Sequence, residues 1–119
     1  MSDPKVEASV RSASNAASIV DIQGEITSFA EGVLMDAYNQ ASGDGAKTII
    51  LNFDGLEYMN SGGIGLLVTM LIRANRHNQK LLAYGLTEHY QQIFELTRLN
   101  EAIRIYPSEA QALAAVTSR

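Results

Sequence analysis

Ser61 stands in a run of small residues, Asn-Ser-Gly-Gly-Ile-Gly over 60–65, that directly precedes an apolar stretch with helical spacing. Asn60 suits the N-cap of such a helix, because its side-chain oxygen can accept a hydrogen bond from a first-turn backbone N–H. Ser61 then takes about the first helical position, where free N–H groups and the helix dipole stabilise anions. A phosphate on its hydroxyl would add about −1.5 to −2 charges at pH 7. The pattern therefore allows a phosphorylation switch, although the same residues are also ordinary turn chemistry.

The glycines of this segment need a physical reason, because each costs about 1 kcal/mol relative to alanine inside a helix. Gly62, Gly63 and Gly65 leave the first turn without side chains, so that another backbone or a partner protein can approach closely. A phosphate on Ser61 would repel or block a partner that docks on this turn. Just before the segment, we expect Tyr58 in the core, and Met59 is left open between core and partner contact.

Residues that could do other chemistry are few. His77 and His89 are the only histidines and fall on different expected helices, and the chain has no cysteine, so we expect neither a metal site nor thiol chemistry. No Gly-Lys-Ser/Thr follows the glycines and no acid–histidine pair accompanies Ser61, which argues against a phosphate-binding loop and a hydrolase triad. Asp54 and Glu57 are expected on a solvated loop. The sequence thus predicts a protein without catalytic residues, metal or cofactor.

The elements that must position Ser61 follow from the spacing of apolar residues. Ser28 and Glu31, and likewise Ser108 and Gln111, have the spacing of a capping box, and Thr87 suits a third cap. The predicted elements are strands over 5–11 and 19–24, a helix over 28–43, a strand over 48–53, a loop over 54–60, a helix over 61–77, a strand over 81–84, a helix over 87–100, a strand over 103–106 and a helix from 108. The order ββαβαβαβα predicts an α/β fold with a mixed, mostly parallel sheet, in which the short first link makes the first pair antiparallel.

Composition sets the outer limits of function. The 119 residues, 46% hydrophobic and 18% charged, are expected to form one globular domain over 1–119, with a flexible tail at 1–4. A net charge of −4 argues against nucleic-acid binding, and the basic cluster Arg73, Arg76, His77 and Lys80 suits the end of a helix. The start lacks an apolar signal core, and the longest apolar run, 64–72, is far below the ~20 residues of a membrane span. We therefore expect a cytoplasmic protein without membrane insertion.

Four segments in order resemble the STAS domain and, within it, the anti-sigma-factor antagonists. The signature of that family, roughly aromatic, apolar, Asp, Ser, Ser or Thr, Gly, apolar, Gly, is similar to Tyr-Met-Asn-Ser-Gly-Gly-Ile-Gly over 58–65. Its Gly-Glu-Leu-Asp stretch resembles Gly-Glu-Ile over 24–26, followed here by Thr27. Residues 96–106 and 108–113 resemble its closing segment and C-terminal helix. The resemblance covers nearly the whole chain and departs from the family pattern at Asn60 and Thr27, where the family often has Asp.

The resemblance implies a STAS-like fold and a place in a partner-switching pathway. In that family the unphosphorylated antagonist binds an anti-sigma factor that is also a serine kinase, and the sigma factor is released. The kinase then phosphorylates the signature serine with ATP and magnesium, and a separate phosphatase reverses the mark. Ser61 matches that serine by position. The residues expected to contact the partner are Thr27, Ser28, Met59, Asn60, Ser61, Gly62 and Gly63.

Other functions are also open to a chain of this class. One is a non-catalytic STAS scaffold subunit of a stress-sensing complex or of a transporter, which would need a separate membrane partner. Another is a small enzyme or nucleotide-binding domain, because a fold of this class hosts many activities. A second copy of the chain, as a homodimer, is a further candidate partner.

Overall fold

The computed structural model describes residues 5–13, 16–43 and 45–117, so the expected tail at 1–4 lies outside the described residues. Five strands form one sheet in the order β1-β2-β3-β4-β5, with β1 antiparallel to β2 and all other pairs parallel. This confirms the predicted α/β class, the mixed sheet and the antiparallel first pair. The elements are β1 (Val6–Ser12), β2 (Ala17–Ile26), the 3-10 turn η1 (Ser28–Ala30), α1 (Glu31–Gly43), β3 (Thr48–Met59), α2 (Ser61–Arg76), β4 (Lys80–Tyr84), α3 (Glu88–Leu96), η2 (Leu99–Glu101), β5 (Ile103–Tyr106) and α4 (Glu109–Thr117).

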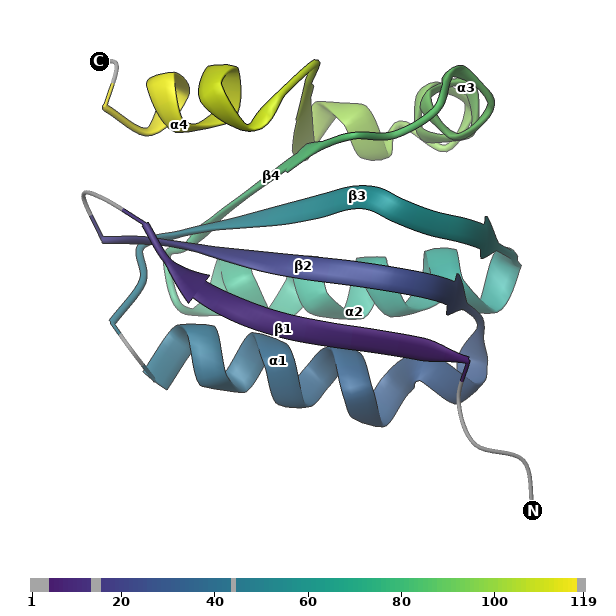
Figure 1. The fold of residues 1–119 in the computed structure, drawn as a ribbon, viewed down its shortest axis with the longest axis horizontal. Coiled ribbons are helices and arrows are strands. Elements are labelled where there is room, and N and C mark those ends of the chain that lie inside the picture. Colours follow the sequence, from purple (N-terminus) through teal and green to yellow (C-terminus); the bar gives the residue numbers. More distant parts are fainter. Residues whose placement is uncertain (1–4, 14–15, 44, 118–119) are drawn as a thin grey trace.

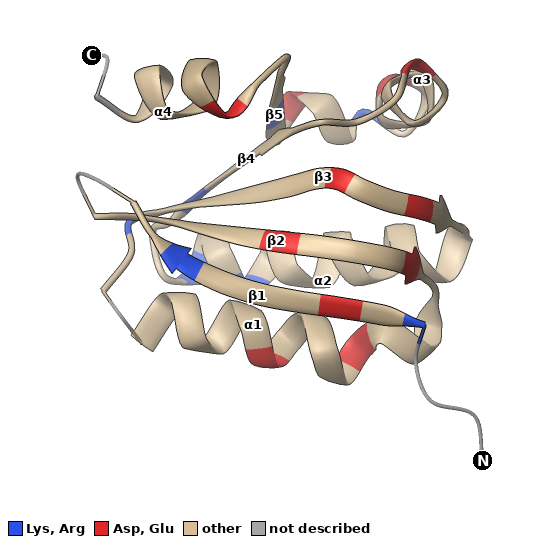
Figure 2. Cartoon of the chain, viewed as in Figure 1, with Lys and Arg blue, Asp and Glu red and all other residues tan. Residues whose placement is uncertain are grey.

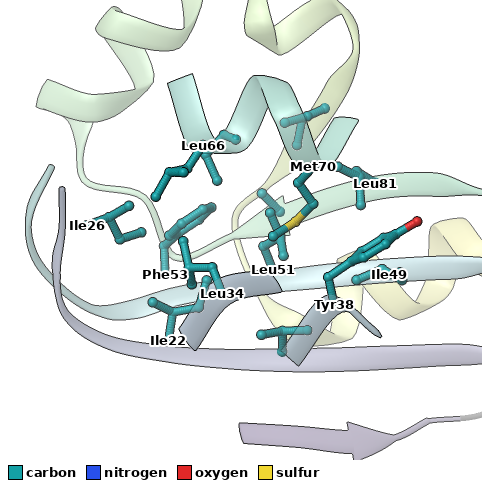
Figure 3. Packing of buried hydrophobic residues seen from close by; sticks show 14 of the residues in the cluster. Ile22, Ile26, Leu34, Tyr38, Ile49, Leu51, Phe53, Leu66, Met70 and Leu81 are labelled. Carbon is teal, nitrogen blue, oxygen red and sulfur yellow. The ribbon is translucent and has the colours of Figure 1, made fainter. Parts of the chain in front are cut away.

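Helices cover the two faces of the sheet unequally. The pair α1 and α2 lies along one face, and α4 lies on the opposite side (Figure 1). The larger core forms under α1 and α2, where apolar residues of both helices meet those of the strands (Figure 3). Phe53 of β3 meets Phe94 of α3 edge to face, with ring centroids 6.4 Å apart. This continuous apolar layer fixes α2, and with it Ser61, against the sheet.

The face under α4 has a smaller apolar cluster and a chain of polar contacts. Ile19, Ile50, Leu82, Tyr84 and Ala112 form the buried cluster. Beside it, the Arg11 guanidinium donates to Asp21 Oδ2 at 2.6 Å and to Glu109 Oε1 at 3.0 Å. The Tyr84 hydroxyl donates to the same Glu109 oxygen at 2.9 Å. The first residue of α4 is therefore tied to β1 and β4 by hydrogen bonds.

β3 is much longer than predicted, because the segment 54–59 is strand and not loop. Its second half continues the parallel pairing with β2, which itself runs to Ile26, and Glu25 lies opposite Tyr58. Register shifts in β2 near Asp21 and Gly24 interrupt the regular pairing. The first half of β3 is mostly apolar, but exposed Asp54 and Glu57 interrupt this pattern in the second half. The sequence pattern therefore did not predict that the strand continues through 54–59.

The helix starts differ from the predicted caps in two of three places. Thr27, not Ser28, caps the first helical segment, and its Oγ1 accepts from the Phe29 N–H at 3.2 Å. Thr87 occupies the N-cap position of α3 but makes no side-chain capping hydrogen bond, and α3 ends at Leu96, before the expected Asn100. Ser108 accepts from the Gln111 N–H at 3.3 Å, which confirms that cap. In the described part of the chain, no helix has the length and apolarity that crossing a bilayer requires.

Candidate functional site

Ser61 is the first residue of α2 and lies directly after the end of β3, on the surface. Asn60 is the N-cap, as predicted, with extended backbone and with its Oδ1 accepting from the Gly63 N–H at 3.0 Å. Its own N–H donates to the Ile26 carbonyl at 3.3 Å. The residue before Ser61 is thus held from both sides, by the end of β2 and by the first turn of α2.

Two of the three glycines serve the chain's own packing. A Cβ on Gly63 would overlap the Ile26 carbonyl oxygen, and one on Gly62 would lie 3.0 Å from the Ser28 nitrogen. A Cβ on Gly65 would meet nothing within 4 Å. The close approach expected of the glycines therefore occurs between α2 and the segment that links β2 to α1, and only Gly65 leaves open space.

The structure brings most of the predicted partner-contact residues together. Thr27 lies between β2 and η1, and Ser28 is the first residue of η1, which packs against the first turn of α2 next to Asn60, Gly62 and Gly63. Met59 is the exception, because its side chain is buried and belongs to the large core. Its N–H donates to the Tyr90 hydroxyl at 2.9 Å, so α3 also fixes the end of β3.

Tyr58 was expected in the core, and that expectation is wrong. Its side chain is 47% exposed, whereas Met59 points inward. The reason is the strand itself, because successive side chains of β3 point to opposite faces and only one of the two can enter the core. Phe29 of η1 is 75% exposed on the segment that contacts α2. Two aromatic side chains thus stand on the surface close in sequence to the site.

An exposed apolar stripe continues from Ser61 along α2. Gly65, Val68 and Ile72 follow Ser61 at four, seven and eleven residues, which places all four on one side of a helix. All four are exposed, whereas Leu66, Leu67 and Met70 on the opposite side are buried. Sequence reasoning missed this stripe, although the helical spacing was there to indicate it.

Charge is distributed unevenly along α2. The first turn has no acidic residue, and Arg73 and Arg76 lie in the last turn, where cations complement the helix dipole. Acidic residues lie on β1, β2 and β3 in Figure 2, and Glu25 and Glu57 are near the carboxyl ends of β2 and β3. A negative group added at Ser61 would therefore meet a favourable helix end, with Glu25 and Glu57 on the neighbouring strands.

The other candidate residues lie apart from Ser61 in the sequence or make contacts of their own. His77 contacts the Arg73 carbonyl through Nδ1 at 2.8 Å, and the His89 ring packs against Tyr90 with centroids 4.8 Å apart. Within the described ranges, no group of three or more His, Asp and Glu side chains is arranged to hold a metal ion. Asp54 and Glu57 are exposed on β3. His77 at the end of α2, His89 in α3, and Asp54 and Glu57 in β3 thus lie on different elements.

Comparison with known proteins agrees with this arrangement. The STAS domain family matches residues 7–112. The anti-sigma-B factor antagonist of Staphylococcus aureus is 27% identical over 86 residues, which cover 72% of this chain and 80% of that protein. An anti-sigma factor antagonist from Mycobacterium paratuberculosis has the same fold, with a TM-score of 0.81 and 20% identity over 99% of this chain and 100% of that one. The Bacillus cell fate determinant SpoIIAA in its phosphorylated form aligns with a TM-score of 0.70 and 19% identity over 92% of this chain and 98% of that one. The chain therefore belongs to the STAS domain family, and its similar relatives include anti-sigma-factor antagonists.

Proposed function

We propose that this protein is an anti-sigma-factor antagonist whose unphosphorylated form binds an anti-sigma factor that is also a serine kinase, and so releases a sigma factor. Phosphorylation of Ser61 ends the interaction. The observation that carries this proposal is the exposed Ser61 at the first position of α2, held by the Asn60 cap. The similarity to SpoIIAA, a protein of the same fold with a phosphorylated form, supports phosphorylation as the means of control.

The docking surface in this proposal combines the first turn of α2 with its exposed stripe. Val68 and Ile72 offer apolar area that extends from Ser61, and Phe29 adds an aromatic ring from the neighbouring segment. Apolar contact of this kind loses its advantage when a dianion must be buried beside it, because desolvation of the charge costs free energy. A phosphate on Ser61 thus opposes docking without any rearrangement of the partner.

The protein acts in this scheme as a substrate and a binding partner, and the enzymes are the kinase and a serine phosphatase. The kinase transfers the terminal phosphoryl group of Mg-ATP to the Ser61 hydroxyl and releases ADP, and the phosphatase hydrolyses the phosphate from Ser61. We place this exchange in the cytoplasm, where sigma factors act on transcription. Asn60 preserves the cap that an Asp would make, and Thr27 caps η1, so both departures from the family pattern remove a charge and keep the local geometry.

The direct test is incubation of the protein with its cognate kinase and Mg-ATP, followed by intact mass measurement. The expected result is one phosphate per chain, with none on Ser61→Ala. Ser9→Ala is a matched control, because Ser9 is an exposed serine on β1, outside the predicted partner contacts, and should leave the phosphate in place. If the kinase still added a phosphate to Ser61→Ala, Ser61 would not be the phosphorylated residue.

The state of assembly separates this function from that of a scaffold subunit. An antagonist that exchanges partners is expected as a monomer or a homodimer when alone, whereas a subunit of a stress-sensing complex is expected to form larger species. Size-exclusion chromatography with light scattering measures the difference. A large homogeneous assembly of the isolated chain would favour the scaffold.

A further inference from the structure

The strand β5 has one side that no other described strand covers, because it is last in the order of the sheet. Two hollows flank it. One, of about 500 Å³, lies between β5 and α3 and includes Gln91 and Glu95. The other, of about 780 Å³, wraps around the starts of β4 and β5, between α2 and α4. Both include Arg104 and Tyr106, so together they form a continuous depression around this edge, which we call the β5 trough.

The larger hollow of the β5 trough has a cationic rim over an apolar lining. Lys47, Lys80 and Arg104 line it, and all three are exposed. Figure 2 shows the corresponding basic segments at the start of β4 and on β5. Among the described residues, the ion pairs are those of Arg11, so these three cations have no carboxylate partner at salt-bridge distance. The other charged residue of the hollow is Glu101, and its apolar lining includes Leu82, Tyr106 and Val116.

We propose that the β5 trough binds an extended segment of another protein, which adds to β5 as a sixth strand and directs an acidic side chain into the larger hollow. A free strand edge presents backbone N–H and C=O groups that pair readily with an added strand. Successive side chains of such a strand point to opposite faces of the sheet, so every second side chain can turn toward the larger hollow, whose lining includes Ala115 and Val116 of α4. Three unpaired cations select carboxylates for the larger hollow.

The β5 trough lies away from Ser61 itself. Leu71 and Asn75, in the second half of α2, line the larger hollow, whereas Ser61 is the first residue of the same helix. A helix of 16 residues extends about 24 Å at about 1.5 Å per residue. The larger hollow therefore lies toward the opposite end of α2 from Ser61, and a segment in the β5 trough would leave Ser61 accessible, whereas Ile72 at the far end of the exposed stripe is next in sequence to Leu71 of the hollow.

The probe for a test is a capped six-residue peptide of alternating Glu and Val, compared with one of alternating Lys and Val. Both are titrated into the full ¹⁵N-labelled chain and followed by the backbone amide signals. We expect the Glu–Val peptide to shift the amides of 103–106 together with those of Lys80 and Leu82. Its binding should be at least about tenfold tighter than that of the Lys–Val peptide and should weaken with salt. Equal binding of the two peptides, or no shift in β5 at millimolar peptide, would overturn the proposal.

Two double variants of equal charge test the position of the site. Lys80→Glu with Arg104→Glu is expected to weaken the Glu–Val peptide at least about tenfold. Arg73→Glu with Arg76→Glu changes the net charge equally but lies outside the trough, and its effect should stay within about twofold. Thermal melting of both variants checks that they fold, and equal losses in the two would overturn the assignment to the trough.

An N-methylated peptide tests separately whether the bound segment pairs with β5 through backbone hydrogen bonds. A Glu–Val peptide methylated at alternate nitrogens cannot donate along one edge and should lose the shifts of 103–106, whereas retained binding would overturn strand addition. Shifts in β5 that depend on protein concentration without peptide would instead assign the edge to a second copy of the chain.

Discussion

The two faces of the sheet are closed by different means. Under α1 and α2 the contacts are apolar and continuous from Ile26 at the end of β2 to Leu81 in β4 (Figure 3). Under α4 a small apolar cluster is supplemented by hydrogen-bonded charges from Arg11, Asp21 and Glu109. Apolar burial is insensitive to pH and little affected by salt, whereas exposed ion pairs depend on both. We infer that the apolar face under α1 and α2 supplies most of the folding stability. The polar contacts on the other face mainly fix the position of α4.

The largest expected effect tests the apolar face. Phe94 is fully buried and meets Phe53 edge to face, so Phe94→Ala should lower the free energy of unfolding by about 3–5 kcal/mol. Leu96→Ala is the control on the same helix, because Leu96 is 84% exposed, and it should change stability by less than about 0.5 kcal/mol. Urea unfolding measures both. Similar losses in the two variants would mean that burial does not set the contribution of this face.

The next effect concerns the point where the apolar face meets the candidate site. Gly63→Ala would place a methyl group on the Ile26 carbonyl and should cost about 1–3 kcal/mol. Gly65→Ala, two residues on, meets open space and should stabilise α2 by up to about 1 kcal/mol. Thermal melts of the two variants should therefore shift in opposite directions. A gain at both positions would contradict the close packing of α2 on β2.

A smaller effect is expected on the α4 face. Glu109 accepts from both Arg11 and Tyr84 but is partly exposed, so Glu109→Gln should cost about 0–1 kcal/mol, less in 1 M salt. Glu95→Gln provides a control at an exposed position outside this polar chain. Chemical unfolding at low and high salt would reveal the difference. A loss of several kcal/mol would mean that the polar chain, and not the apolar cluster, holds α4.

The smallest effect is a dependence on pH that belongs to one face alone. The hydrogen bond from Arg11 lowers the pKa values of Asp21 and Glu109. Stability from these groups is present above their unfolded pKa values, about 3.9 and 4.3, and is lost as pH falls through their folded values. Melting temperature should thus decline in acid, and Arg11→Ala should flatten that part of the decline. If the melting temperature of Arg11→Ala declined in acid as much as that of the unchanged protein, the contacts of Arg11 with Asp21 and Glu109 would not be the cause of the decline.

At alkaline pH, Tyr84 on the same α4 face makes folding stability fall as the pH rises. Burial and the hydrogen bond to Glu109 raise the pKa of Tyr84 to about 12. A raised pKa stabilises the folded state below the unfolded value of about 10 and loses that contribution as pH rises through the folded one.

The order of strands and helices and the Asn60 cap could be predicted from the sequence, but the length of β3 and the orientation of Tyr58 could not. Alternating and helical spacing identified every strand and main helix, and the Asn60 cap followed from residue type alone. The second half of β3 could not be recognised, because its charged residues point to solvent and its pairing depends on register shifts in β2. For the same reason Tyr58 was placed in the core, although Met59 takes that place. The role of Gly62 and Gly63 also required the structure, because their neighbours come from Ile26 and Ser28.

The tight junction around Asn60 bears on how fast the protein can respond. Its N–H is bonded to Ile26, its side chain to Gly63, and the preceding Met59 to Tyr90. A group attached to Ser61 would change the charge and shape of the surface, and the backbone at Met59 and Asn60 would keep its conformation. Under the proposed function, the delay between stimulus and altered transcription would then be set by the enzymes that write and erase the mark, and by partner release, and not by a slow conformational transition of this chain.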